Sequence, residues 1–114
     1  MIELGRRAAA CKHWRWLPGM QPLTLDDEED WMPCDRVWMT QGGKPSPPEG
    51  AMPDLTDPAT LGCLLALVRE ALDDSRIHCR TRANKFRVYS GVTPIGEWAN
   101  SEGAALVAAL EAAK

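Results

Sequence analysis

The sequence lacks long apolar runs and most motifs that indicate a particular chemistry. Its longest uncharged helical stretch, 61–68, is far shorter than the ~20 residues that cross a bilayer, so we expect no membrane contact. The four cysteines include no C-x-x-C pair, which removes the stronger zinc and redox signals. The segment 42–45 lacks the glycine spacing and the Ser or Thr of a phosphate-binding loop. With no catalytic motif, we expect a non-enzymatic protein without a cofactor.

Phenylalanine and tyrosine are almost absent, with one of each, whereas tryptophan occurs five times. Ile, Asn and Lys are also scarce, while Ala, Gly, Arg and Pro are plentiful, which is typical of a gene rich in G and C. Some tryptophans can therefore stand where another genome encodes Phe or Tyr, because all three rings serve as core or interface anchors. The position of each Trp is thus better evidence for function than their number.

The length and charge describe one soluble domain. A chain of 114 residues with 45% hydrophobic residues and a net charge of −3 can fold without metal or disulfide bonds. An arginine pair, Arg6-Arg7, precedes Cys11 as in a lipoprotein signal, but no apolar segment separates them. We therefore expect a cytoplasmic protein whose thiols are reduced.

The second half of the chain has regular periodicity. It follows a Pro/Gly-rich stretch, 41–53, which we interpret as a loop or linker. An N-cap residue with proline at the first helical position predicts a helix over 57–73, and apolar spacing predicts another over 101–113. Between them, two alternating segments around 83–85 predict a β-hairpin, and 94–99 a third strand.

The first half is irregular and carries four of the five tryptophans. A short helix is predicted over 2–10, and strands over 12–16 and 36–40 that would extend the same sheet. The predicted class is α+β, with a short antiparallel sheet packed against the two later helices. A flat sheet edge in such a small domain also makes a homodimer a plausible assembly.

Two helical segments carry a resemblance to known proteins. The leucine-rich 57–71 and the alanine-rich 101–113 are similar to those of small phage and prophage proteins of the ABA-sandwich type, over residues 53–114. In that group, a helix, a short antiparallel sheet and an alanine-rich helix form a compact sandwich. The resemblance implies a fold and a phage origin, and it supplies no catalytic motif.

The predicted hairpin is strongly basic. Its segment 76–87 contains no Asp or Glu, and His78 joins the cations on the outward face. This face is suited to phosphates of nucleic acid or a nucleotide, with Tyr89 available for base stacking. A solvated sheet face is the alternative, because exposed strand residues are commonly charged. The candidate binding residues here are Arg80, Arg82, Lys85, Arg87 and Tyr89.

An acidic cluster has the opposite character. It consists of Asp26, Asp27, Glu28, Glu29 and Asp30. Carboxylates in sequence can bind a cation, but five in a row without a glycine-shaped ligand loop are more typical of a solvated turn. A third interpretation is that acidic side chains beside exposed aromatics imitate nucleic acid toward a host protein's basic groove.

The thiols and histidines do not define a metal site. Cys11, His13 and Cys34 offer three ligands, and His78-Cys79 a fourth, but no spacing brings them together. Buried or incidental thiols are the simpler interpretation. A nucleophilic Cys–His pair is a formal alternative, but no sequence motif in the chain indicates one. We therefore predict no bound metal.

The tryptophans divide by context. Trp14 lies among cations, including Arg15, where base stacking or cation–π contact is an option. Core packing is expected for Trp16, Trp38 and Trp98, and Trp31 beside the acidic cluster should be the most exposed. We therefore add Trp14, Arg15 and Trp31 to the candidate binding residues.

Two functions remain ahead of a metal or thiol enzyme. The first is a small phage-type protein that binds a host bacterial protein, for instance as an inhibitor of a defence protein. The second is a nucleotide- or nucleic-acid-binding module that uses the basic hairpin. Size, charge segregation and the phage resemblance favour the first.

Overall fold

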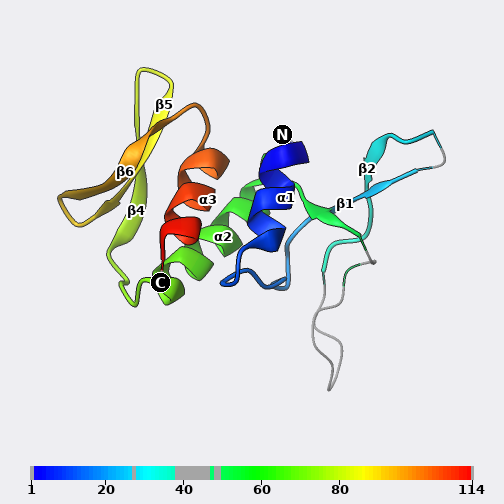
Figure 1. Cartoon of the computed structure of the whole chain (residues 1–114), viewed down its shortest axis with the longest axis horizontal. Helices are drawn as coiled ribbons and strands as arrows, with labels where there is room; N and C mark the ends of the chain where they lie inside the picture. Colours follow the sequence, from blue (N-terminus) through cyan, green and yellow to red (C-terminus); the bar gives the residue numbers. More distant parts are fainter. Residues whose placement is uncertain (1, 27, 38–46, 48–49, 114) are drawn as a thin grey trace.

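The computed structural model describes residues 2–26, 28–37, 47 and 50–113. Three helices lie between two small antiparallel sheets, one at each end of the longest axis (Figure 1). The elements in chain order are α1 (Ile2–Ala10), β1 (Pro22–Leu25), β2 (Trp31–Pro33), β3 (Met52–Pro53), α2 (Pro58–Ala71), β4 (Ile77–Arg82), β5 (Lys85–Ser90), β6 (Thr93–Ala99) and α3 (Glu102–Ala112). This arrangement confirms the α+β class.

The second half of the chain follows the sequence prediction closely. Asp57 caps α2, with Pro58 at the first helical position, and Ser101 caps α3 by accepting a hydrogen bond from the backbone N–H of Ala104. The three strands form one sheet in the order β4-β5-β6. α3 covers the inner face of this sheet, and α2 packs against α3 and β4 (Figure 1). The predicted first helix is also present as α1.

The first half of the chain differs from the prediction. Residues 12–16 form a turn and irregular backbone, and 36–37 lie outside any strand, while 38–40 fall outside the described residues. The predicted extension of the main sheet was wrong, because other residues build a separate sheet in the order β2-β1-β3. Proline explains part of this arrangement. Pro33 and Pro53 lie in its two edge strands, where a missing N–H costs no ladder bond.

The core lies between the main sheet and the helices. Ile77 of β4 and Val88 of β5 are fully or nearly fully buried against the helical layer. Alternation along these strands therefore sends the intervening side chains to the opposite, outer face. The helices and loops contribute further buried side chains, including Leu64, Leu67, Val68, Leu106, Val107 and Leu110.

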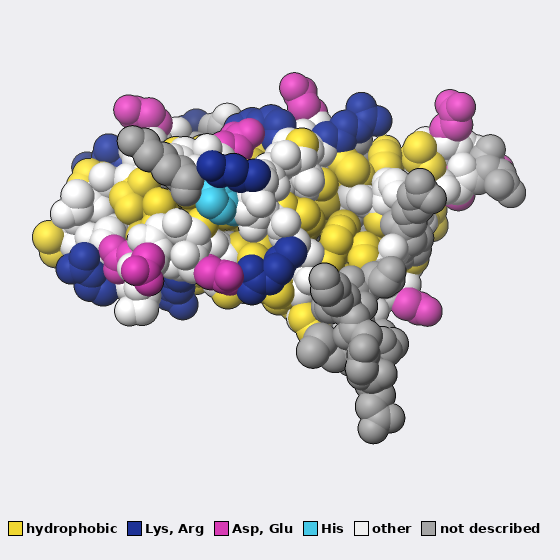
Figure 2. Space-filling view, turned by 60° about the horizontal axis from the view of Figure 1, so that its bottom comes forward, with side chains coloured by type: hydrophobic (Ala, Val, Ile, Leu, Met, Phe, Trp, Pro, Cys, Tyr) yellow, Lys and Arg dark blue, Asp and Glu magenta, His cyan; other side chains and the backbone are white. Residues whose placement is uncertain are grey.

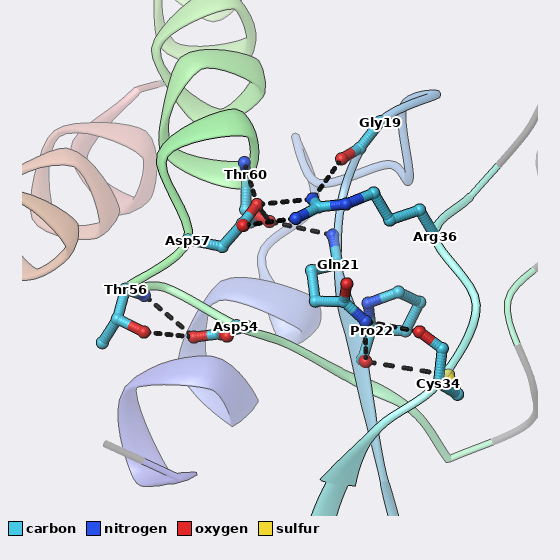
Figure 3. Close-up of polar contacts among 9 residues, drawn as sticks. All are labelled: Gly19, Gln21, Pro22, Cys34, Arg36, Asp54, Thr56, Asp57 and Thr60. Carbon is cyan, nitrogen blue, oxygen red and sulfur yellow. Dashed lines mark hydrogen bonds and ion pairs between the residues drawn. The ribbon is translucent and has the colours of Figure 1, made fainter.

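A polar network joins the irregular first half to the start of α2 (Figure 3). The Asp57 carboxylate accepts two hydrogen bonds from Arg36, at 2.8 and 2.7 Å, and one from the Thr60 backbone N–H. The buried Thr60 hydroxyl accepts one from the Gln21 backbone N–H, at 2.9 Å. Arg36 also donates to the Gly19 carbonyl oxygen. The cap of α2 thus holds two distant loops in place.

Candidate functional site

The outer face of the β4–β5 hairpin gathers the basic side chains that the sequence analysis singled out. The strand register places six polar side chains on this face in three directly opposed pairs. The pairs are His78 with Tyr89, Arg80 with Arg87, and Arg82 with Lys85. We call these six residues the basic face.

A two-residue turn fixes this register. Ala83 and Asn84 both have positive φ, 50° and 63°, as a type I′ hairpin turn requires. Asparagine tolerates the left-handed region, and the twist of such a turn matches that of the two strands. A shift of one residue would turn every cation toward the helices, so the turn chemistry helps to position the basic face.

Most cations of the basic face lack a carboxylate partner. Within the described part of the chain, the ion pair of this hairpin joins Arg76 to Asp74, and none involves Arg80, Arg82, Lys85 or Arg87. Like charges that oppose each other across strands destabilise a sheet. The pairs Arg80–Arg87 and Arg82–Lys85 therefore concentrate positive charge at a cost in stability.

Tyr89 lies at the centre of the polar contacts on this face. The guanidinium carbon of Arg80 is 4.5 Å from the centre of the tyrosine ring, and that of Arg87 is 5.9 Å away. The His78 ring stacks with it at 6.0 Å. Arg80 Nε donates to His78 Nε2, so His78 carries its proton on Nδ1 and donates it to the Arg76 carbonyl oxygen. Tyr89 thus orients guanidinium groups at the surface.

Trp98 of β6 borders the basic face, a position that the sequence analysis missed. The Arg87 guanidinium carbon lies 5.7 Å from the Trp98 ring centre, and Arg87 Nε donates to the Gly96 carbonyl oxygen at 2.9 Å. Trp98 is 36% exposed, so its predicted place in the core was wrong. Its neighbour Ala99 pairs with Phe86 and faces the core, which sends Trp98 outward.

The other predicted binding residues of the first half lie elsewhere. Arg15 forms an ion pair with Glu70 of α2 at 2.7 Å. Trp14 packs edge-on against Trp16, with ring centres 5.4 Å apart, and both contact the core, as predicted for Trp16. The predicted core residue Trp38 lies outside the described residues. Trp14 and Arg15 also line a pocket of about 340 Å³ together with Lys12, His13, Leu67, Glu70 and Ala71.

The acidic cluster forms the tip of the β1–β2 hairpin, which we call the acidic arm (residues 25–32). The Asp26 carboxylate accepts hydrogen bonds from the backbone N–H groups of Glu28 and Asp30, so it orders the turn. Asp27 lies outside the described residues, and the other acidic side chains are exposed. Figure 2 shows acidic and hydrophobic side chains close together at this tip, at the right of the view.

Exposed apolar side chains accompany the acidic residues of the arm. Leu25 is 52% exposed and Met32 is 50% exposed. Trp31 is only partly exposed, less than Trp98, so the expectation that Trp31 would be the most exposed tryptophan was wrong. Figure 1 places the arm at the opposite end of the molecule from the basic face. The two charged surfaces therefore do not form one site.

The three candidate metal ligands each contact a backbone carbonyl oxygen. Cys11 contacts that of Leu110, His13 that of Ala113 and Cys34 that of Pro22. Across the residues that the structure describes, no three side chains of His, Cys, Asp or Glu are grouped as metal ligands would be. We therefore base no function on these residues.

Comparison of the chain with models of protein families, with curated proteins and with solved structures gave no match. Within the described ranges, none of the helices has the length and apolar character needed to span a bilayer. Function is therefore inferred from the chemistry and geometry of the two charged surfaces.

Proposed function

We propose that the protein binds nucleic acid through its basic face. The observation that carries this proposal is the presence of two like-charged cross-strand pairs, Arg80–Arg87 and Arg82–Lys85, without carboxylate partners among the described residues. Such pairs cost folding stability, and phosphate groups would neutralise them. Aromatic rings beside the cations, from Tyr89 and Trp98, add contacts that a base can use.

The negative net charge of the chain does not oppose this proposal. The acidic arm lies at the far end of a molecule whose longest extent is 44 Å (Figure 1). Exposed charges are largely screened beyond about 8 Å at physiological salt. The carboxylates of the arm therefore have little effect on a phosphate bound near the hairpin.

Charge reversal at the centre of the basic face tests this proposal. We expect Arg80→Glu with Arg87→Glu to weaken binding of a fluorescent oligonucleotide about thirtyfold at low salt, because two phosphate contacts become repulsive. The measurement is fluorescence anisotropy between about 50 and 200 mM salt, where affinity for the unaltered protein should fall steeply.

A matched control separates local contacts from net charge. Arg6→Glu with Lys12→Glu changes the net charge equally, on exposed residues of α1 and the turn after it. This variant should bind nearly as well as the unaltered chain. Failure of the unaltered protein to bind any oligonucleotide at low salt would refute the proposal, as would equal affinities for the two double variants.

We propose as a second candidate function that the acidic arm docks onto a host bacterial protein. The exposure of Leu25 and Met32 beside ordered carboxylates favours it, because apolar groups next to acidic ones suit a basic groove with apolar walls. The resemblance of 53–114 to phage proteins supports a bacterial defence protein as the partner.

Replacing the arm's exposed side chains tests the docking proposal. The test variant combines Leu25→Ser, Met32→Ser and Glu29→Gln. Compared with the unaltered chain, it should capture at least tenfold less of the partner protein from a bacterial lysate, as measured by quantitative mass spectrometry. The Arg80→Glu, Arg87→Glu variant should still capture it. Retention of the same protein by the arm variant would exclude docking through this surface.

A further inference from the structure

The two aromatic rings at the basic face are not equally available to a ligand. The Arg80 guanidinium covers the Tyr89 ring at 4.5 Å, and His78 stacks with the same ring. The Trp98 ring has the more offset Arg87 guanidinium 5.7 Å from its centre, and 36% of Trp98 is exposed. Trp98 is therefore the ring on which a planar ligand can stack.

The shape of the sheet disfavours entry into a DNA groove. Three strands at ~4.8 Å spacing make a backbone about 10 Å wide before side chains are added, against a major groove ~12 Å wide. The helix α3 lies directly behind the sheet (Figure 1). The basic face therefore meets nucleic acid as a broad surface, and duplex bases hide their faces within the stack.

We propose that the preferred ligand is single-stranded nucleic acid, with an unpaired base stacked on Trp98 and adjacent phosphates bound by Arg87 and Arg80. This inference rests on the nucleic-acid function proposed above and adds its ligand class and the residue that selects it. Base–aromatic stacking tolerates any sequence, because every base has a π-face. The preference is therefore for strandedness and not for sequence.

Arg87 is placed to connect the base to the backbone of the strand. Its Nε donates to the Gly96 carbonyl oxygen, and its guanidinium carbon lies 5.9 Å from the Tyr89 ring centre and 5.7 Å from the Trp98 ring centre. Among the described residues, neither terminal nitrogen of the Arg87 guanidinium has a hydrogen-bond partner. Both can therefore donate to a phosphate. Tyr89 acts as a positioning residue because its ring contacts the guanidinium groups of both Arg80 and Arg87.

Three probes of equal length separate stacking from phosphate binding. They are single-stranded oligothymidine, an abasic deoxyribose–phosphate strand, and a DNA duplex. We expect the unaltered protein to bind oligothymidine about tenfold more tightly than the abasic strand. Trp98→Ala should weaken oligothymidine binding about tenfold and leave the abasic strand unaffected, and Trp98→Phe should recover most of the loss.

Tryptophan fluorescence gives a second readout. Stacking of thymine on Trp98 should quench the emission, and Trp98→Phe should remove that quenching while preserving the fold. Trp31→Phe, in the distant acidic arm, is the matched control and should retain it. Circular dichroism and the melting temperature verify that each variant is folded.

The outcomes distinguish this inference from the proposed function. If Trp98→Ala weakens the oligothymidine and abasic complexes equally, or if the duplex binds as tightly as oligothymidine, the single-strand inference is overturned while nucleic-acid binding stands. If none of the three probes binds at low salt, both proposals are overturned.

Discussion

Replacing Asp57 with alanine should lower the free energy of unfolding by about 3 kcal/mol. About 1 kcal/mol comes from the lost N-cap of α2, and the remainder from charged hydrogen bonds to Arg36. The Asp57 side chain is only 12% exposed, so water replaces these contacts poorly. Urea unfolding monitored by circular dichroism measures the change.

Asparagine at the same position separates the cap from the ion pair. Asn caps helices about as well as Asp, so Asp57→Asn should retain the bond to the Thr60 backbone and lose only the charge. We expect Asp57→Asn to cost about half as much as Asp57→Ala. Equal losses in the two variants would show that the cap contributes nothing separate from the ion pair.

The pH dependence of stability provides a further check on Asp57. Its hydrogen bonds from Arg36 hold the pKa of the Asp57 carboxyl well below its ordinary value of 3.8. A carboxyl with a lowered pKa stabilises the folded state above its ordinary pKa and loses that contribution as the pH falls. The stability difference between the unaltered chain and Asp57→Asn should therefore shrink as the pH falls below about 4.

A second carboxyl titrates in the same acidic range and remains in the Asp57→Asn variant. Hydrogen bonds from Ser90 and then Arg76 lower the pKa of Asp74 to about 2. Some acid sensitivity should therefore persist in Asp57→Asn. If the acid denaturation curves of the variant and the unaltered chain were parallel, the charge of Asp57 would have no role in stability.

The second half of the fold was predictable because its signals are local. Asp57-Pro58 marks the start of α2, and Ser101 that of α3, through caps that depend on neighbouring residues. Strict alternation in 77–82 and 85–90 gave the correct face for the basic residues, because one side of the hairpin is buried. Local chemistry and tertiary packing agree here.

The first half was less predictable because its contacts join distant residues. Gly19 donates its backbone N–H to the Val37 carbonyl oxygen, and the Val37 N–H donates to Met20. Neither pairing is marked by a periodic pattern in the sequence. Polar and apolar residues alternate over 12–16, but this segment forms no strand, and its tryptophan rings pack against the core instead. β3 joins the separate sheet through a long-range pairing of the same kind, between Pro22 and Pro53.

The candidate site was only partly predictable for a similar reason. The basic residues follow from alternation, but Trp98 follows only from the register of β6, which is irregular between Phe86 and Val88. Gly96, with φ of 79°, lies in this irregular part of the strand. The placement of Trp98 therefore depends on a bulge and on the pairing of Ala99, which composition does not reveal.

The glycines of α2 and α3 should respond oppositely to substitution. A Cβ at Gly103 would lie 3.1 Å from both the Cβ and the carbonyl oxygen of Leu55, which is buried in the loop before α2. Valine is stiff at χ1 and cannot turn away, so Gly103→Val should cost about 3 kcal/mol through overpacking. Thermal and urea unfolding measure this loss.

Alanine substitutions provide the matched comparison. A Cβ at Gly62 of α2 meets nothing within 4 Å, so Gly62→Ala should stabilise the protein by up to ~1 kcal/mol through helix propensity. Gly103→Ala gains the same helix propensity but should still destabilise the protein. The atoms that the new Cβ would meet are the Cβ and the backbone carbonyl oxygen of Leu55, which cannot move aside as the end of a flexible side chain can. If both alanine variants were more stable than the unaltered chain, close packing of α3 on the Leu55 loop would be excluded. The opposite signs would show that Gly103 is required for contact between α3 and the loop that carries the Asp57 cap.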